Sequence, residues 1–162
     1  MERPAIEAVI FDFGGVLTTS PFEAFNRLEA ERGLPRDFIR SVNATNPDDN
    51  AWARLERSEI DHEMFGALFA AEAKALGHAL DGAEVLGVIA GDLRPEMVAA
   101  LDRLLREGLR VACITNNIKG KRGPGMAATA AAAQRYDAVF ARFEHVLESA
   151  QAGVRKPDPR IF

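Results

Sequence analysis

The chain has 162 residues, of which 48% are hydrophobic and 27% charged, so it is long enough for an ordinary globular domain. Its net charge of -4 argues against a general nucleic-acid or anionic-membrane surface, because both need a basic excess. The single cysteine, Cys113, excludes an internal disulfide and a cysteine-based zinc site. No apolar stretch approaches the ~20 residues of a membrane span. Together, these two features of the sequence predict a cytoplasmic protein.

The first predicted element is a strand over residues 6–11. This apolar run ends in Asp12, and a pair of glycines, Gly14 and Gly15, follows at once. The pattern is typical of a buried parallel strand that leads into a tight turn. A carboxylate at the carboxyl end of such a strand lies where open α/β sheets bind ligands. Asp12 is therefore a candidate nucleophile, metal ligand, or both.

Residues 18–91 carry helical patterns and no strand signal. We expect a first helix with Ser20 as N-cap, Pro21 in its first turn, a capping box with Glu23 and an end at Gly33. Further helical segments are expected at 35–41, 51–57, 58–76 and 83–89, with a loop at 43–50. Because a crossover between parallel strands needs far fewer residues, we interpret this block as a helical cap inserted over the strand ends.

The pattern changes after residue 91. We expect helices at 95–107 and 127–136, strands at 109–115, 137–140 and 145–148, a glycine-rich basic loop at 116–125, and a last helix from Pro157. This alternation predicts an α/β fold with a parallel, Rossmann-like sheet. The core would comprise residues 1–17 and 92–162, and the cap residues 18–91.

Polar residues with complementary chemistry follow the predicted strands. Asp12 follows the first strand, Thr115 and Asn116 follow the second, and Lys156 lies in a late loop. Phosphoryl transfer needs an attacking oxygen, donors for the phosphoryl oxygens and positive charge. This set of residues supplies all three.

Three motifs occur in order along the chain: VIFDFGGVL at 9–17, ITNN at 114–117, and a segment over 148–162 that ends in GVRKPDPRIF. Between the first two lies WARLERSEI at 52–60. With these motifs the chain resembles the haloacid dehalogenase superfamily of hydrolases, most closely the branch that includes the N-terminal phosphatase-like domain of soluble epoxide hydrolases. The segment at 52–60 resembles part of that branch's small helical cap.

The resemblance implies a role for each motif residue. Asp12 would attack a small phosphorylated metabolite and carry a covalent aspartyl intermediate. Thr115 would hold the transferred group with help from Asn116, and Lys156 would neutralise the negative charge. Mg²⁺ would be held by Asp12, by the backbone carbonyl of Gly14 and by an acid of a fourth motif.

The substrate would also contact Gly15 and two residues of the cap, Trp52 and Arg54. Glu56 is a further candidate for this face of the cap. Trp52 is equally well interpreted as a packing anchor, since large aromatic side chains dominate the contacts of small cores.

Two departures from the family pattern leave an alternative open. Gly14 replaces the usual second Asp, a general acid/base of the kind that contributes ~10²–10⁴-fold to rate. The fourth motif does not occur before Phe162, so we expect a truncated core and a chain that is a fragment. The alternative is therefore a catalytically weak or inactive relative that binds a ligand or partner. The sequence predicts neither a particular substrate nor an oligomeric state.

Overall fold

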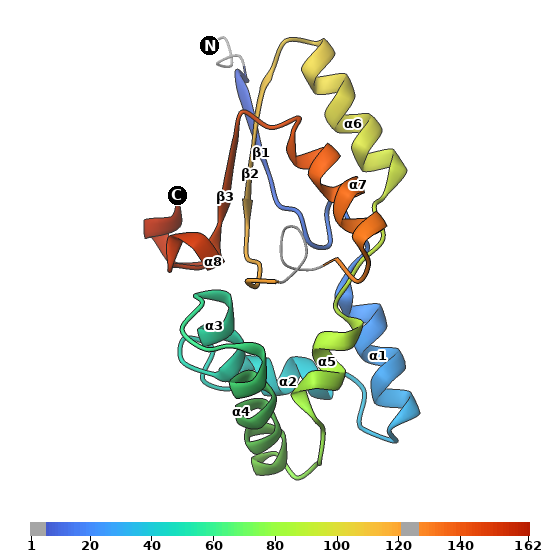
Figure 1. Ribbon diagram of the computed structural model, residues 1–162, viewed down its shortest axis with the longest axis vertical. Helices are drawn as coiled ribbons and strands as arrows, with labels where there is room; N and C mark the ends of the chain where they lie inside the picture. The colour runs from blue at the N-terminus through green and yellow to red at the C-terminus, as the bar shows by residue number, and fades with distance from the viewer. Residues whose placement is uncertain (1–5, 121–126) are drawn as a thin grey trace, which may run out of the picture.

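The computed structural model describes residues 6–120 and 127–162, so most of the basic part of the loop expected at 116–125 lies outside the described residues. Three strands, β1 (Ala8–Phe11), β2 (Arg110–Thr115) and β3 (His145–Glu148), form a parallel sheet in the order β1-β2-β3 (Figure 1). The register places Phe11 beside Cys113, and Cys113 beside Val146. The predicted α/β fold with a parallel sheet is confirmed.

Two long helices cover one face of this sheet, α6 (Pro95–Arg106) and α7 (Ala130–Phe140) (Figure 1). They enclose a core cluster with the sheet that comprises Phe11, Phe13, Leu17, Leu101, Val111, Cys113, Tyr136, Val139 and Phe143. The strand expected at residues 137–140 is wrong, because this segment is the last turn of α7. Ala133, Tyr136 and Val139 are buried at three-residue spacing, which keeps one face of the helix on the sheet.

The chain after β3 continues into two short helical pieces. These are α8 (Ser149–Ala152) and a 3₁₀ turn over Pro159–Ile161, which stands where a longer last helix was expected. The side chain of Asp158 caps this turn by accepting a hydrogen bond from the backbone N–H of Arg160. The segment between the two pieces carries Lys156.

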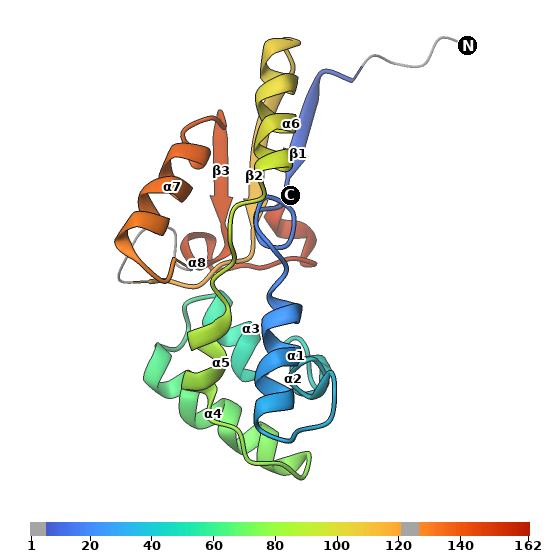
Figure 2. The same ribbon diagram turned by 90° about the vertical axis from the view of Figure 1, so that its right-hand side faces the viewer.

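Five helices form a separate layer beyond the carboxyl ends of the strands (Figures 1 and 2). They are α1 (Pro21–Glu31), α2 (Phe38–Ala44), α3 (Ala51–Glu56), α4 (His62–Ala75) and α5 (Gly82–Val88). Their apolar faces meet in a second cluster, whose fully buried members include Phe25, Ile39, Phe65, Phe69 and Val85. This layer, hereafter the cap, therefore has a hydrophobic core of its own.

Local hydrogen bonds explain where the cap helices begin. Ser20 is the N-cap of α1 as expected, but it accepts from the N–H of Phe22, and no reciprocal bond from Glu23 is found in the described part of the chain. The buried Glu29 carboxylate accepts hydrogen bonds from the N–H groups of Asp37 and Ile39. Helix α2 therefore begins after Asp37, three residues later than expected.

Two linkers run side by side between the sheet layer and the cap. The N–H of Thr19 donates to the carbonyl of Asp92 at 2.8 Å, and the N–H of Arg94 donates to the carbonyl of Leu17 at 2.8 Å. Thr18 and Leu93 form an antiparallel bridge between them. The division into domains at 17/18 and 91/92 stays a prediction. Across residues 6–120 and 127–162, no helix combines the length and the apolar character needed to cross a membrane.

Candidate active site

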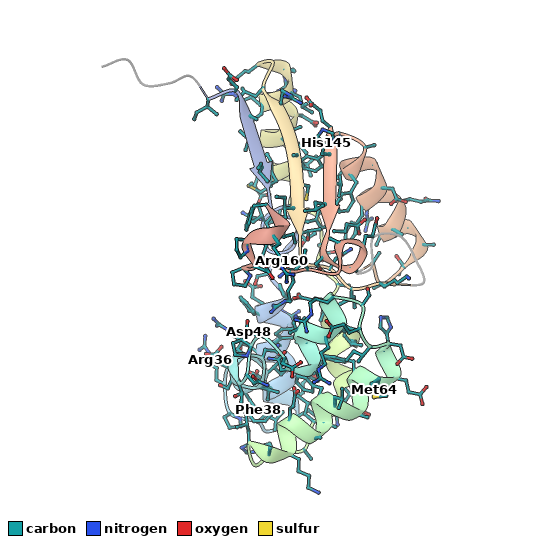
Figure 3. The ribbon with its side chains drawn as sticks, turned by 90° about the vertical axis from the view of Figure 1, so that its left-hand side faces the viewer. Arg36, Phe38, Asp48, Met64, His145 and Arg160 are labelled. Carbon is teal, nitrogen blue, oxygen red and sulfur yellow. The ribbon has the colours of Figure 1, made fainter. Side chains whose placement is uncertain are left out.

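A cavity of about 510 Å³ lies between the carboxyl ends of the strands and the cap. The opposite end of the sheet, where His145 begins β3, points away from the cap (Figure 3). The cavity is lined by Asp12, Gly14, Gly15, Val16, Ser20, Pro21, Phe22, Phe25, Asn43, Asn50, Trp52, Glu56, Asn116, Arg155 and Lys156. Segments far apart in the sequence therefore converge on one volume of the size of a small-molecule site.

Asp12 and Lys156 form an ion pair in the wall of this cavity. The Nζ atom of Lys156 lies 2.8 Å from Oδ2 of Asp12 and donates a second hydrogen bond, also at 2.8 Å, to the carbonyl of Ile114. The N–H of Phe13 donates to Oδ1 of Asp12 at 2.8 Å. The Asp12 side chain is nevertheless 41% exposed. Its carboxylate is thus fixed in orientation while one side stays open to a ligand.

Asn116 joins the end of β2 to the segment that carries Lys156. Its Oδ1 accepts from the backbone N–H of Lys156 at 2.8 Å, and its Nδ2 donates to the carbonyl of the same residue at 3.1 Å. The preceding residue, Thr115, is buried at the strand end, with its hydroxyl 3.4 Å from the carbonyl of Asn116. Asn116 lines the cavity, whereas Thr115 is buried and is not among the lining residues.

The turn after β1 brings the backbone, rather than a second acid, to the cavity. Gly15 has a φ of +77°, a conformation that favours glycine, and the N–H of Leu17 closes the turn on the carbonyl of Phe13 at 2.9 Å. A Cβ at Gly14 would find no atom within 4 Å. The position of the usual second Asp is thus empty space that a side chain can occupy.

The cap contributes Trp52 and Glu56 from α3 to the cavity wall. The Nε1 atom of Trp52 donates to Oε1 of Glu56 at 3.0 Å, and the indole packs edge-on against Phe25 and Phe65. Trp52 therefore both lines the cavity and anchors the cap core. Burial raises the pKa of the Glu56 carboxyl, while Arg155, Trp52 and Lys156 act in the opposite direction.

Arg155 belongs to the site, although the sequence reasoning did not single it out. Its Nε donates to Oε2 of Glu56 at 2.5 Å, and its Nη1 donates to the carbonyl of Pro47 at 3.0 Å. The only signal in the sequence is its place beside Lys156. A partner 99 positions away in the chain is not readable from one sequence.

Arg54 does not line the cavity. Its guanidinium forms a two-pronged ion pair with Asp49 on the cap surface, with an Nε–Oδ1 distance of 2.9 Å and an Nη2–Oδ2 distance of 3.0 Å. Because α3 is helical, residues 52 and 56 share one face and residue 54 points elsewhere. Of the three candidates on the cap, Trp52 and Glu56 line the cavity and Arg54 does not, so the substrate contact expected of Arg54 has no support in this geometry.

The donors available to a metal ion are few. The Asp12 carboxylate and the Gly14 backbone line the cavity, whereas no group of three or more His, Cys, Asp or Glu side chains placed to hold a metal is found in residues 6–120 and 127–162. Mg²⁺ is commonly held by one or two carboxylates together with substrate phosphates and water. The donor set thus fits Mg²⁺ shared with a phosphorylated ligand better than a site closed by protein alone.

The fold and the cavity at the strand ends are those of an α/β protein with a small-molecule site, and comparison with known proteins gives the family. The chain belongs to the haloacid dehalogenase-like hydrolase family, whose model matches residues 6–162. It is 29% identical over 96% of its length to mouse acyl-CoA dehydrogenase family member 10, and 26% identical over 98% to mouse bifunctional epoxide hydrolase 2. It spans only 14% and 30% of the length of these two relatives.

Solved structures share the fold at low sequence identity. L-2-haloacid dehalogenase from Xanthobacter autotrophicus, with chloropropionic acid covalently bound, is 18% identical with a TM-score of 0.54 over 97% of this chain and 62% of that one. A haloacid dehalogenase family enzyme from Bacteroides thetaiotaomicron, in complex with magnesium and inorganic phosphate, is 15% identical with a TM-score of 0.54, covering 97% of this chain and 75% of that enzyme. Dehalogenases are thus among the neighbours in fold.

Proposed function

We propose that the chain hydrolyses a small phosphorylated metabolite through an aspartyl intermediate on Asp12. The observation that carries this proposal is the Asp12–Lys156 ion pair, at 2.8 Å, in the wall of a cavity covered by the cap. A carboxylate of this kind is a nucleophile, and an ammonium ion beside it offsets the charge of the phosphoryl group.

Each residue has a definite part in the proposed reaction. An oxygen of Asp12 attacks phosphorus, the phosphorus–oxygen bond to the leaving alkoxide breaks, and solvent water protonates the alkoxide. A second water then attacks the phosphorus of the aspartyl phosphate, which releases inorganic phosphate and restores the Asp12 carboxylate. Lys156 stabilises the developing negative charge, and the Thr115–Asn116 strand end holds the phosphoryl oxygens. Gly15 lets the backbone approach the phosphoryl group, and Trp52 contacts the remainder of the substrate. Arg54, which faces away from the cavity, is not part of this proposal.

Mg²⁺ is the cofactor that we assign to this reaction. Asp12 and the Gly14 carbonyl would hold it, and when bound it would supply positive charge to the phosphoryl oxygens. The magnesium and phosphate in the Bacteroides enzyme support this assignment.

A second candidate function is a catalytically weak domain that binds a ligand or partner. Gly14 favours it, because no side chain stands there to protonate the leaving alcohol. Without such a group, an alkoxide must leave unassisted, and hydrolysis of alkyl phosphates slows by about 10²–10⁴-fold.

Phosphate release from p-nitrophenyl phosphate with Mg²⁺ tests the proposal. The wild-type chain should turn over, and Asp12→Asn should lose the activity, because an amide is a poor nucleophile. Asp102→Asn is the matched control, since Asp102 lies on α6, pairs with Arg142 and does not line the cavity. Equal phosphate release by wild type and Asp12→Asn would refute an Asp12 nucleophile. Chloride release from 2-chloropropionate without phosphate release would show that the chain is a dehalogenase and not a phosphatase.

A further inference from the structure

Arg155 holds two separate parts of the cap at once. Its Nε donates to Glu56 at the end of α3, and its Nη1 donates to the Pro47 carbonyl in the loop before α3. The two side chains of the ion pair are only 20% and 10% exposed. A pair this shielded from water is screened weakly, and loss of either partner leaves an uncompensated charge.

The next residue in the chain is the lysine that contacts Asp12. The backbone of Lys156 is fixed on one side by Asn116, through both of its peptide groups, and on the other by the anchored side chain of Arg155. The Nζ of Lys156 then reaches both Ile114 and Asp12. A continuous series of contacts therefore runs from the cap to the proposed nucleophile.

We propose that Arg155 is a positioning residue that makes the placement of the Lys156 ammonium depend on the docked cap. With Glu56 and Pro47 in contact, the Lys156 backbone stays where its Nζ meets Asp12. With the cap withdrawn, Arg155 loses both partners and Lys156 loses one of its two backbone restraints. The lysine, still bound to Asn116 and Ile114, is then held less firmly beside Asp12, so the docked cap favours the assembled site.

The cap does not depend on Arg155 alone for its attachment. The hydroxyl of Ser58 donates to the carbonyl of Ala150 at 2.8 Å, and the two linkers are hydrogen-bonded to each other at Thr19 and Asp92. Removal of the Arg155 side chain should therefore loosen the Lys156 segment while the cap and the sheet keep their own cores. Loosening of the Lys156 segment in a protein that still folds would distinguish a positioning role of Arg155 from a general contribution of Arg155 to folding.

Lysine acylation resolved by mass spectrometry measures the placement of Lys156 without any need for activity. Acetic anhydride is the probe, and the exposed Lys74 on α4 is the internal reference. In the wild type, Lys156 should react more slowly than Lys74, because its Nζ is held by two acceptors. Arg155→Met and Glu56→Gln should each raise the Lys156 rate several-fold and leave the Lys74 rate unchanged.

Arg110→Met is the matched control, because it removes an Arg–Glu pair, with Glu144, at the other end of the sheet. Glu56→Gln keeps the length of the side chain and an acceptor for Trp52, so it serves if Arg155→Met does not fold. Unchanged Lys156 acylation in a folded Arg155→Met or Glu56→Gln variant, judged by circular dichroism, would overturn the proposal. So would an equal rise in Arg110→Met.

The catalytic consequence rests on the proposed function, whereas the placement of Lys156 does not. If the chain is a phosphatase, Arg155→Met should lower kcat on the order of 10- to 100-fold with little change in KM, because a misplaced group weakens the transition state. A rise in KM alone would instead make Arg155 a substrate ligand and overturn its positioning role. If wild type shows no turnover, the proposed function fails and the acylation result still decides the inference.

Discussion

Gly91 lies directly against Thr19, where the two linkers between the sheet layer and the cap pass each other. A Cβ at residue 91 would lie 2.8 Å from the carbonyl oxygen of Thr19 and 3.0 Å from side-chain atoms of Thr18. The carbonyl of Gly91 also accepts a hydrogen bond from the hydroxyl of Tyr136 on α7. The junction of cap and core thus has no room for a side chain at this position.

Gly91→Ala should therefore destabilise the protein by about 1–3 kcal/mol, the usual cost of overpacking a tight contact. Gly87→Ala is the control, because a Cβ there meets nothing within 4 Å and the residue lies in α5, where alanine favours the helix. Urea denaturation should show the first variant less stable than wild type and the second equal or more stable. A stable Gly91→Ala variant would show that the linkers do not pack this closely.

Gly14→Asp should raise phosphatase activity towards alkyl phosphates by about 10²–10⁴-fold, because it supplies the missing acid at an open position of the cavity. Gly14→Asn occupies the same space without an acidic proton and should give no such gain. Initial rates with an alkyl and an aryl phosphate measure the effect, which should be smaller for the better aryl leaving group. Equal gains in the two variants would contradict an acid role.

Cys113 should be unreactive in the native protein at neutral pH. Burial, with a smaller contribution from the charge of Asp12, raises its pKa from 9.0 to about 12. The thiolate is the reactive form, so Ellman's reagent at pH 8 should label Cys113 only after unfolding. Rapid labelling of the folded chain would contradict this burial.

The same pKa shift predicts how stability changes with pH. Below pH 9 the thiol is protonated in both states and has no effect on the balance. Between pH 9 and about 12 the unfolded chain loses this proton while the native chain retains it, so the free energy of unfolding falls as pH rises. Cys113→Ala should show a shallower fall over this range in urea denaturation, and an unchanged slope would contradict the linkage.

Strand β1 pairs only with β2 within the described sheet, and its Ile10 side chain is 60% exposed. An apolar edge strand offers unpaired backbone groups to other chains. Ile10→Lys should therefore lower concentration-dependent association in sedimentation velocity, whereas Ile10→Val should leave it close to wild type. If all three proteins associate equally, the β1 edge is not the surface involved.

The sequence was most informative where the chemistry of a strand end is local. The apolar runs before Asp12 and Thr115 were sufficient to predict two parallel strands, because few other elements combine such runs with an abrupt polar end. It was least informative at residues 137–140, where β-branched and aromatic residues suit a strand as well as a helix. The helix prevails because it continues the buried face of α7.

The cap side of the site was only partly predictable. Three residues, Trp52, Arg54 and Glu56, were candidates for one face, but a helix brings together residues three or four apart and not residues two apart. That spacing, applied to α3, would have selected Trp52 and Glu56. The pairing of Glu56 with Arg155 depends on how the cap docks, which is a property of the tertiary structure.

The insertion of the cap between β1 and β2 also bears on how the chain folds. Pairing Phe11 with Cys113 requires closure of a very long loop, which is entropically costly and slow in an unstructured chain. The cap has a hydrophobic cluster of its own, and its two ends meet at Thr18 and Leu93. If the cap helices fold first, they bring the ends of the future strands β1 and β2 together. The cap, which supplies Trp52 and Glu56 to the cavity, then also serves as the nucleus that aligns the sheet.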